Sequence, residues 1–273
     1  GFLAPTYGTS STLGVQLTTP YFWNIAPHRD VTLKPKFTSD EGVVWGGEYR
    51  ERTHTGDYSL DGSIAYSDER DDEGRETGSK VARGHLFSEG DFQLNPVWNY
   101  GYQFERASDD TYLSFYRLSS RDTLTTRPYI EGINGRNYAS GTAYFFQGLE
   151  AEDDQDQIPM VFPLLDFNHV GTPGASGAFT SLDANFMALQ RVDGADSRRL
   201  SLEGGWHLPH IGRSGSVYRL SATLRGDAYH VNKVDVAGTA RTTQARGFTG
   251  RLRPEIMAEW RLPLVRRMGP IQQ

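Results

Sequence analysis

Apolar and polar residues alternate along most of the chain, so successive side chains fall on opposite faces of an extended backbone. In residues 251–262, one face carries Leu252, Ile256 and Trp260, while the other carries mainly arginine and glutamate. Residues 217–230 repeat this pattern. Helical periodicity is nearly absent, so the sequence predicts an all-β protein.

The alternating segments predict about 13 strands, most of them about 9 to 13 residues long. Strands in soluble sheets average about 5 to 6 residues, whereas a tilted strand that crosses a bilayer needs about 9 to 11. Strand length therefore favours a sheet that spans a membrane. The predicted strands are residues 12–23, 29–38, 42–53, 57–67, 82–93, 95–106, 121–133, 136–148, 158–168, 177–191, 197–207, 217–230 and 249–263.

Aromatic residues gather at the ends of two predicted strands. Tyr21, Phe22 and Trp23 end the first strand, and residues 144–146 end the eighth. Aromatic girdles at both membrane surfaces are typical of outer-membrane barrels. Together with strand length, they predict an antiparallel transmembrane β-barrel. A soluble β-sandwich, in which two sheets pack face to face, is the alternative.

Composition narrows the function without deciding it. The 273 residues are 37% hydrophobic and 23% charged, and none is cysteine, so disulfides and cysteine-based zinc sites are excluded. A net charge of −6 without a dense basic stripe argues against a nucleic-acid partner. No run of about 18 apolar residues predicts a transmembrane helix, and no signal peptide is visible. Without a linker or a fixed repeat, residues 1–273 are expected to form one domain.

No set of residues predicts catalysis or metal binding. The seven histidines lack metal-site spacing, and residues 174–179 match a nucleophile elbow only loosely. The acidic runs 68–76 and 150–156 are candidates for Ca²⁺ binding through clustered carboxylates, but they lack the spacing of a calcium loop. We interpret both runs as solvated loops, and we expect no enzyme activity, metal or cofactor.

Residues 18–35 carry three prolines where strands are predicted. Pro20 lies inside the first predicted strand, Pro35 inside the second, and Pro27 between them. Proline gives no amide hydrogen to a β-ladder, so it belongs at strand edges, strand starts or bulges. On the residues alone, Pro20 ends a strand and Pro35 marks a bulge.

The same stretch resembles the start of the barrel domain of the LptD family, the lipopolysaccharide-assembly proteins of the Gram-negative outer membrane. The family pattern begins G-F-L-x-P and S-S, continues P-Y-Y-W-N-I-A-P-N-x-D-x-T-x-x-P, and ends G-G-E-x-R. Phe22 replaces a tyrosine of this pattern, and His28 replaces an asparagine. The matching residues are Gly1, Phe2, Leu3, Pro5, Ser10, Ser11, Pro20, Tyr21, Trp23, Asn24, Ile25, Ala26, Pro27, Asp30, Thr32, Pro35, Gly46, Gly47, Glu48 and Arg50.

Later segments of the chain also resemble this family, particularly its α-proteobacterial members. These segments are residues 108–116, 137–149 and 158–170. The resemblance implies that residues 1–273 are the N-terminal part of a larger barrel. The family's periplasmic β-jellyroll and its C-terminal strands have no counterpart here, so we expect a partial barrel wall.

The resemblance also implies a function. The family inserts lipopolysaccharide into the outer leaflet of the outer membrane, with the lipoprotein LptE as a plug and the bridge protein LptA bound to the jellyroll. The lipid leaves through a lateral gate between the first and last strands, and no bond is made or broken. Pro20 and Pro35 match the prolines that weaken the gate strands. The aromatic edge and turn beside them are Tyr21, Phe22, Trp23, Asn24 and Pro27.

Charged residues on the polar face of the last two predicted strands are expected to line the barrel lumen. There they would contact water, sugar or the plug. A general porin or channel shares the barrel features but needs no proline pair. A soluble carbohydrate-binding β-sandwich is the second alternative, and an enzyme the third. The lumen candidates are Arg219, Arg225, Asp227, Arg253, Glu255 and Glu259.

Overall fold

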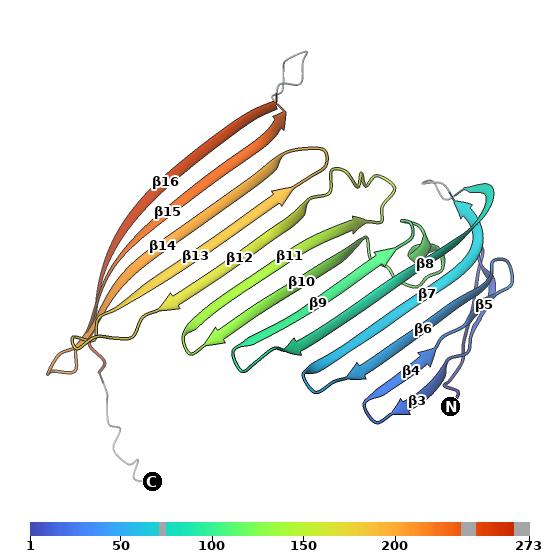
Figure 1. Cartoon of the computed structure of the whole chain (residues 1–273), viewed down its shortest axis with the longest axis horizontal. Helices are drawn as coiled ribbons and strands as arrows, with labels where there is room; N and C mark the ends of the chain where they lie inside the picture. Colours follow the sequence, from blue (N-terminus) through green and yellow to red (C-terminus); the bar gives the residue numbers. More distant parts are fainter. Residues whose placement is uncertain (71–74, 236–243, 265–273) are drawn as a thin grey trace, which may run out of the picture.

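The structure is a computed structural model that describes residues 1–70, 75–235 and 244–264. These residues form one antiparallel sheet in which most strands follow one another in chain order (Figure 1). The N-terminal strands and β16 lie at opposite edges, so the sheet formed by the described residues is not closed. Strands dominate the described residues, which confirms the predicted all-β class.

Sixteen strands and one short helix make up the regular structure of the described residues. Strands are short near the N-terminus and long from β6 onward. Their bounds are β1 Thr6–Ser10, β2 Gly14–Thr18, β3 Tyr21–Ala26, β4 Arg29–Leu33, β5 Lys36–Thr38, β6 Gly42–Arg52, β7 Gly56–Arg70, β8 Glu76–Gln93, β9 Trp98–Ala107, α1 Tyr112–Phe115, β10 Thr123–Asn134, β11 Asn137–Gly148, β12 Met160–Val170, β13 Phe179–Gln190, β14 Asp196–Ile211, β15 Val217–Asp235 and β16 Gln244–Arg261.

The predicted alternation sorts the sheet into an apolar face and a polar face. Between β15 and β16, Gly226 lies opposite Leu252 on the apolar face, and Arg225 lies opposite Arg253 on the polar face. Leu252 is 75% exposed and Trp260 is 62% exposed. A single sheet whose long strands leave large apolar side chains uncovered has the pattern of a barrel wall that meets lipid. The soluble sandwich would need a second sheet over this face, and the described residues form only one.

Proline divides two of the predicted strands, which corrects their boundaries. The predicted strand 12–23 becomes β2 and β3, and the predicted strand 29–38 becomes β4 and β5. The divisions fall at Pro20 and Pro35, because neither residue can donate a ladder hydrogen bond. The aromatic run that begins at Tyr21 therefore starts β3 instead of ending a strand.

One further strand, β1, was not predicted. Its sequence TYGTS has a single large apolar side chain, so it shows no alternation. It forms a strand because it pairs with all of β2. This strand and the two divisions raise the number from about 13 predicted strands to the sixteen in the structure.

Buried apolar side chains concentrate where the connection between β9 and β10 folds against the sheet. Tyr112 and Leu113 of α1, with Tyr116, pack against Leu13 and Val44. The three residues from this connection are at most 1% exposed. This cluster is the main apolar core, and it holds one end of the N-terminal strands. No helix in the described part of the chain is long and apolar enough to span a membrane.

Candidate functional site

Two rows of side chains cross the polar face from β11 to β16. In each row, every residue lies directly opposite the next one on the neighbouring strand. Row A is Ser140, Asp166, Asn185, Ser201, Asp227 and Arg251. Row B is Tyr138, Asn168, Asp183, Glu203, Arg225 and Arg253.

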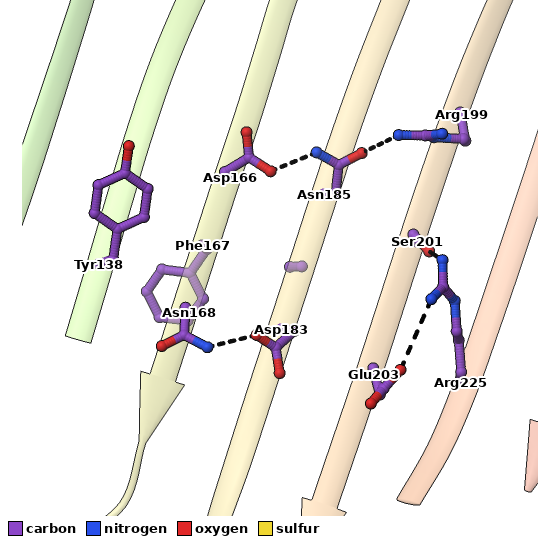
Figure 2. A pocket seen from close by; sticks show the side chains of 11 residues that line it. Tyr138, Asp166, Phe167, Asn168, Asp183, Asn185, Arg199, Ser201, Glu203 and Arg225 are labelled. Carbon is purple, nitrogen blue, oxygen red and sulfur yellow. Dashed lines mark hydrogen bonds and ion pairs between the residues drawn. The ribbon is translucent and has the colours of Figure 1, made fainter. Parts of the chain in front are cut away.

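Row A is held by bonds between its own members and neighbouring arginines. The amide of Asn185 donates to Asp166 and accepts a bond of 2.7 Å from Arg199 (Figure 2). Asp227 is only 4% exposed, and it accepts a hydrogen bond of 3.0 Å from Arg251 Nε. Arg225 Nε donates to the same carboxylate over 3.2 Å. A buried carboxylate with two guanidinium partners is fixed in place, so this wall is preorganised.

A hollow of about 430 Å³ lies along these rows on β11 to β15 (Figure 2). Its polar lining alternates amides, carboxylates and guanidinium groups, with the Tyr138 ring at one end. Asn168 donates to Asp183, and Arg225 Nη2 donates to Ser201 over 3.1 Å. A volume of this size is within the usual range of small-molecule pockets, about 300 to 1,000 Å³.

The structure places all six predicted lumen residues on this polar face. Arg225, Asp227 and Arg253 belong to the two rows. Arg219 and Glu259 lie farther along β15 and β16, where they form an ion pair of 3.0 Å. The sixth, Glu255, lies opposite Thr223. The prediction named residues of β15 and β16 only, and it did not include the polar residues of β11 to β14 on the same face.

A second feature lies at the N-terminal edge of the sheet. In three neighbouring segments, the strand is interrupted at a proline, and we call these interruptions the break line. The break line consists of residues 3–5, 19–20 and 34–35, which contain Pro5, Pro20 and Pro35.

The register shifts by one residue at the Pro5 segment, because Phe2 lies opposite Tyr21 and Thr6 lies opposite Thr18. Between the segments that contain Pro20 and Pro35, the strands keep one register across the break line. Thr18 lies opposite Lys36 on one side, and Tyr21 lies opposite Leu33 on the other. The Thr19 N–H accordingly donates to the Pro35 carbonyl over 3.2 Å. Pro35 has no N–H to return a second bond, so this position keeps one of the two bonds of a paired site.

A second set of backbone bonds at the break line joins the N-terminal residues to the segment that contains Pro20. Leu3 N–H donates to the Pro20 carbonyl over 2.9 Å, and Phe22 N–H donates to the Gly1 carbonyl over 2.8 Å. Residues 1–3 therefore lie along the outer edge of β3. Pro20 offers this edge no donor of its own.

Proline alone does not produce such a break in this chain. Pro128, Pro209 and Pro254 each lie inside a continuous strand, in β10, β14 and β16. At the N-terminal edge, three interruptions fall side by side. The break line is thus set by the alignment of prolines across neighbouring segments.

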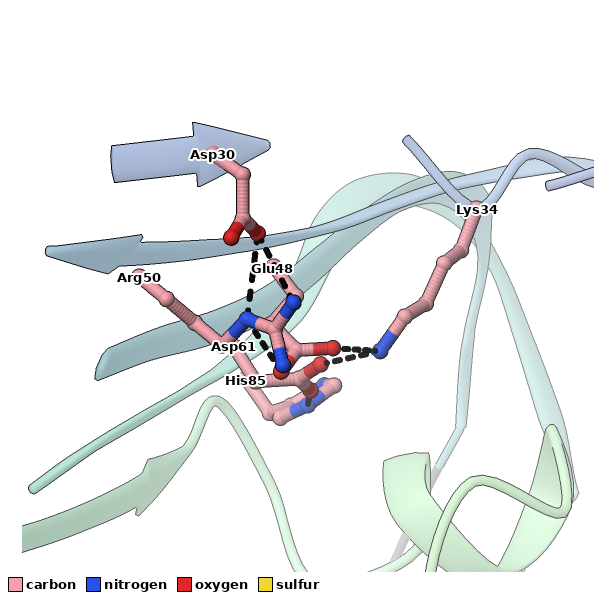
Figure 3. Close-up of polar contacts among 6 residues, drawn as sticks. All are labelled: Asp30, Lys34, Glu48, Arg50, Asp61 and His85. Atoms are coloured by element: carbon pink, nitrogen blue, oxygen red, sulfur yellow. Dashed lines mark hydrogen bonds and ion pairs between the residues drawn. The ribbon is translucent and has the colours of Figure 1, made fainter. Parts of the chain in front are cut away.

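A lysine of the break line forms ion pairs with the polar face of the adjacent strands. Lys34 Nζ lies 2.8 Å from Glu48 and 2.9 Å from Asp61 (Figure 3). The two carboxylates lie directly opposite each other on β6 and β7, so the ammonium group offsets their repulsion. Arg50 forms a second pair with Asp30 at 3.0 Å. Side-chain contacts therefore join the break line and β4 to β6 and β7.

This network continues to α1 through a histidine. Asp61 lies 3.3 Å from His85 Nε2, His85 Nδ1 lies 2.8 Å from the Ser63 hydroxyl, and that hydroxyl lies 2.7 Å from Tyr112 Oη. The order of serine, histidine and aspartate is that of a hydrolase triad. Here the Ser63 hydroxyl is already hydrogen-bonded to Tyr112, which is 0% exposed. We therefore assign these four hydrogen-bonded residues a structural role.

The connection that contains α1 is tied to the sheet by ion pairs as well as by packing. Arg83, 3% exposed, pairs with Asp109 at 2.5 Å and donates to Thr111 over 2.8 Å. Burial raises the pKa of Asp109, but the hydrogen bonds from Arg83, Ser108 and Thr111 outweigh it and hold this pKa below its usual value. Lys36 Nζ donates to the Tyr116 carbonyl over 2.6 Å. The segment thus anchors β5, on one side of the break line.

The predicted gate-strand residues divide between the two faces. Tyr21 and Trp23 lie on the apolar face and are 37% and 56% exposed. Phe22 and Asn24 lie on the polar face, opposite Thr32 and Asp30. Pro27 lies in the turn between β3 and β4. Only the first pair, Tyr21 and Trp23, lies on the apolar face.

Two parts of the N-terminal edge of the sheet were not predicted from the sequence. Pro5 lies in the break line, and the signal was present because Pro5, Pro20 and Pro35 are spaced 15 residues apart. The α1 segment gave no signal of its own. Its bond to Lys36 joins residues 80 apart, and such a contact depends on the sheet register.

The acidic run 150–156 is arranged as a turn. In the run 150–156, Asp153 accepts a bond of 3.0 Å from the Glu150 N–H, which closes a turn. Residues 71–74 of the run 68–76 lie outside the described residues. Within residues 1–70, 75–235 and 244–264, no group of three histidine or acidic side chains is placed to hold a metal ion.

The two-faced antiparallel sheet, its uncovered apolar face and its polar rows define the wall of a β-barrel of the membrane type. Comparison with known proteins gives the family. The family described as LPS transport system D, LptD, matches residues 82–270. The chain belongs to the LptD family.

Individual relatives agree with this assignment. The LPS-assembly protein LptD of Thiobacillus denitrificans is 34% identical over 247 residues, which cover 83% of this chain and 32% of the relative. The protein of that name from Aromatoleum aromaticum is 27% identical over 252 residues, covering 85% and 30%. The Escherichia coli LptD is 25% identical over 284 aligned positions, covering 98% and 35%. The chain spans about a third of the length of these relatives.

Proposed function

We propose that this chain forms part of an outer-membrane barrel that carries lipopolysaccharide to the outer leaflet and releases its lipid sideways at the break line. The relatives are named LPS-assembly proteins, which supports lipopolysaccharide as the transported molecule. The observation that carries the proposal is the alignment of three proline interruptions at one edge of the sheet. A general porin has no use for such an edge.

Hydrogen-bond energetics explain why this edge is suited to opening. Lipid offers no partners to backbone groups, so a fully laddered strand resists separation inside a bilayer. Each backbone bond contributes about 0.5 to 1.5 kcal/mol net in water and more in an apolar medium. Pro20 and Pro35 remove donors in advance, so the outer strands bend or part at a lower cost there than at β6 or β7.

The two faces suit the two parts of an amphiphilic cargo. The apolar face, with Tyr21 and Trp23 beside the break line, meets acyl chains. The polar face, with its arginines and carboxylates, meets water and sugar. Transport on this wall needs no catalytic residue, because no covalent bond changes.

The remaining parts of the proposal follow the family resemblance. Residues 1–273 would be one part of a larger barrel, with the lipoprotein LptE inside it and LptA delivering cargo through a periplasmic domain. The tie of Lys36 to the α1 segment supports a fixed β5, against which the β3–β4 hairpin moves.

The proposal is tested in cells that depend on the whole protein carrying this chain. Pro20→Ala with Pro35→Ala restores two donors, so we expect less lipopolysaccharide at the cell surface at equal protein level. Pro209→Ala with Pro254→Ala is the matched control, since it restores donors in β14 and β16, and we expect normal export. Unchanged surface lipopolysaccharide in the first variant would refute the gate.

A further inference from the structure

Row B places residues of like charge directly opposite each other on neighbouring strands. Asp183 lies directly opposite Glu203, and Arg225 lies directly opposite Arg253. Like charges that face each other across strands destabilise a sheet. Alternating charges would serve a purely structural wall better, so the arrangement points to a ligand that compensates both pairs.

The acidic half of row B retains capacity to accept hydrogen bonds. Asp183 accepts one bond, from Asn168. Glu203 has its ion-pair contact with Arg225 at 3.9 Å, beyond direct hydrogen-bond distance, and its side chain is 36% exposed. Each carboxylate accepts up to about four bonds. Tyr138 and Asn168 continue the row with a ring and an amide, and all lie along the hollow in Figure 2.

The basic half of row B offers positive charge. Arg225 donates to Ser201 and Asp227 through two of its nitrogens. Arg253 is exposed and has no ion pair within the described part of the chain. Two facing guanidinium groups are suited to an anionic group, because their donors match its oxygens.

We propose that row B binds a saccharide chain that bears an anionic substituent. Sugar hydroxyls donate to Asp183 and Glu203 and accept from Asn168, and a sugar ring lies against Tyr138. The anionic substituent lies between Arg225 and Arg253. This site rests on the proposed function, since it assigns a position to the saccharide part of the transported molecule.

Other ligands fit the row less well. A free phosphate would be repelled by Asp183 and Glu203, and a metal ion would be repelled by the arginines. The distance from Tyr138 to Arg225 covers four strand spacings of about 4.8 Å, roughly 19 Å. A chain of several sugar rings spans this length, whereas a single small anion does not.

The test measures saccharide binding to the whole protein in detergent by titration calorimetry. The probes are the delipidated oligosaccharide of the host's own lipopolysaccharide and the same material after dephosphorylation. A further arm, in which carboxyl groups are reduced, shows whether a phosphate or a carboxylate is the anionic substituent.

Arg253→Gln is expected to weaken binding of the anionic oligosaccharide about tenfold, because it removes a charge-assisted contact. Its effect on binding of the oligosaccharide from which the anionic substituent has been removed should be small. Arg261→Gln is the matched control, because it removes the same charge on the same strand and face, about 27 Å away by strand rise. Equal weakening by both variants would overturn the site, since it would indicate a general effect of charge.

Asp183→Asn separates binding from folding. It keeps the side-chain shape and removes the repulsion with Glu203, so thermal stability should stay the same or rise. Binding of both oligosaccharides should fall. A variant that binds as well as the unaltered protein would overturn the acidic half of the site.

Failure of the saccharide site in row B can be distinguished from failure of the proposed gate. Saccharide binding without any export defect in the Pro20→Ala, Pro35→Ala variant would refute the gate and leave the site intact. A clear export defect without saturable binding of either oligosaccharide would overturn the site and leave the gate intact.

Discussion

Thr19 donates its backbone N–H to the carbonyl oxygen of Pro35 over 3.2 Å, and Pro35 has no N–H with which to return the bond. The register is continuous on both sides of this pair. The strands are therefore correctly aligned but incompletely bonded at one level. This combination makes the N-terminal edge of the sheet both ordered and weak.

The Lys34 network should stabilise the strands beside the break line. Lys34→Met leaves Glu48 and Asp61 facing each other without their shared cation. Because all three side chains are partly exposed, we expect a loss of about 1 kcal/mol. The midpoint of thermal unfolding in detergent measures it, with exposed Lys80→Met as the control. Adding Asp61→Asn to Lys34→Met should recover part of the loss, and a further loss would contradict the explanation.

The α1 segment should contribute more, because its side chains are buried. Leu113 is 1% exposed, so Leu113→Ala is expected to cost about 2 to 5 kcal/mol. Leu118 lies in the same connection but is 36% exposed, and Leu118→Ala should cost much less. Denaturant unfolding of the two variants compares them. Equal losses would show that the cluster around α1 is not a core.

The Asp109 carboxylate should make the anchoring of α1 sensitive to acid. Its hydrogen bonds lower its pKa in the folded protein, so its contribution is complete above its unfolded pKa of about 3.9 and is lost as pH falls through the lower folded value. Proteolysis within residues 108–122 should therefore stay slow from neutral pH to about 5 and become faster below about 4. Asp109→Asn should be cut faster already at pH 7. A variant with the unaltered pH profile would contradict this role.

Alternation was sufficient to predict the two faces of the sheet. The faces of β15 and β16 match the predicted ones, since each strand has a period of two and the register stays constant from the Val217–Arg261 pair to the Val231–Gly247 pair. The strand boundaries near Pro20 and Pro35 were less predictable. Local alternation continues through both prolines, and the strands divide where prolines of neighbouring segments lie side by side.

Site residues that can be recognised from a short stretch of sequence were predictable, and residues that only the strand register brings together were not. Pro20 and Pro35 are visible in the sequence, and the resemblance gave them a hypothesis. The charge pairs of row B were not visible, because facing residues such as Arg225 and Arg253 are fixed by register. The same holds for Lys36 and Tyr116, which meet only after the four strands between them, β6 to β9, have formed.

The central claim is that Pro20 and Pro35 weaken the sheet at one edge. Hydrogen exchange of backbone amides in the whole protein, embedded in lipid nanodiscs, tests it most directly. In the unaltered protein, amides of residues 14–38 should exchange faster than those of β6 and β7. In Pro20→Ala with Pro35→Ala they should slow by about 2- to 10-fold, because two donors return to the ladder. Exchange in β10 to β16 should not change. Equal protection of residues 14–38 in both proteins would contradict the account.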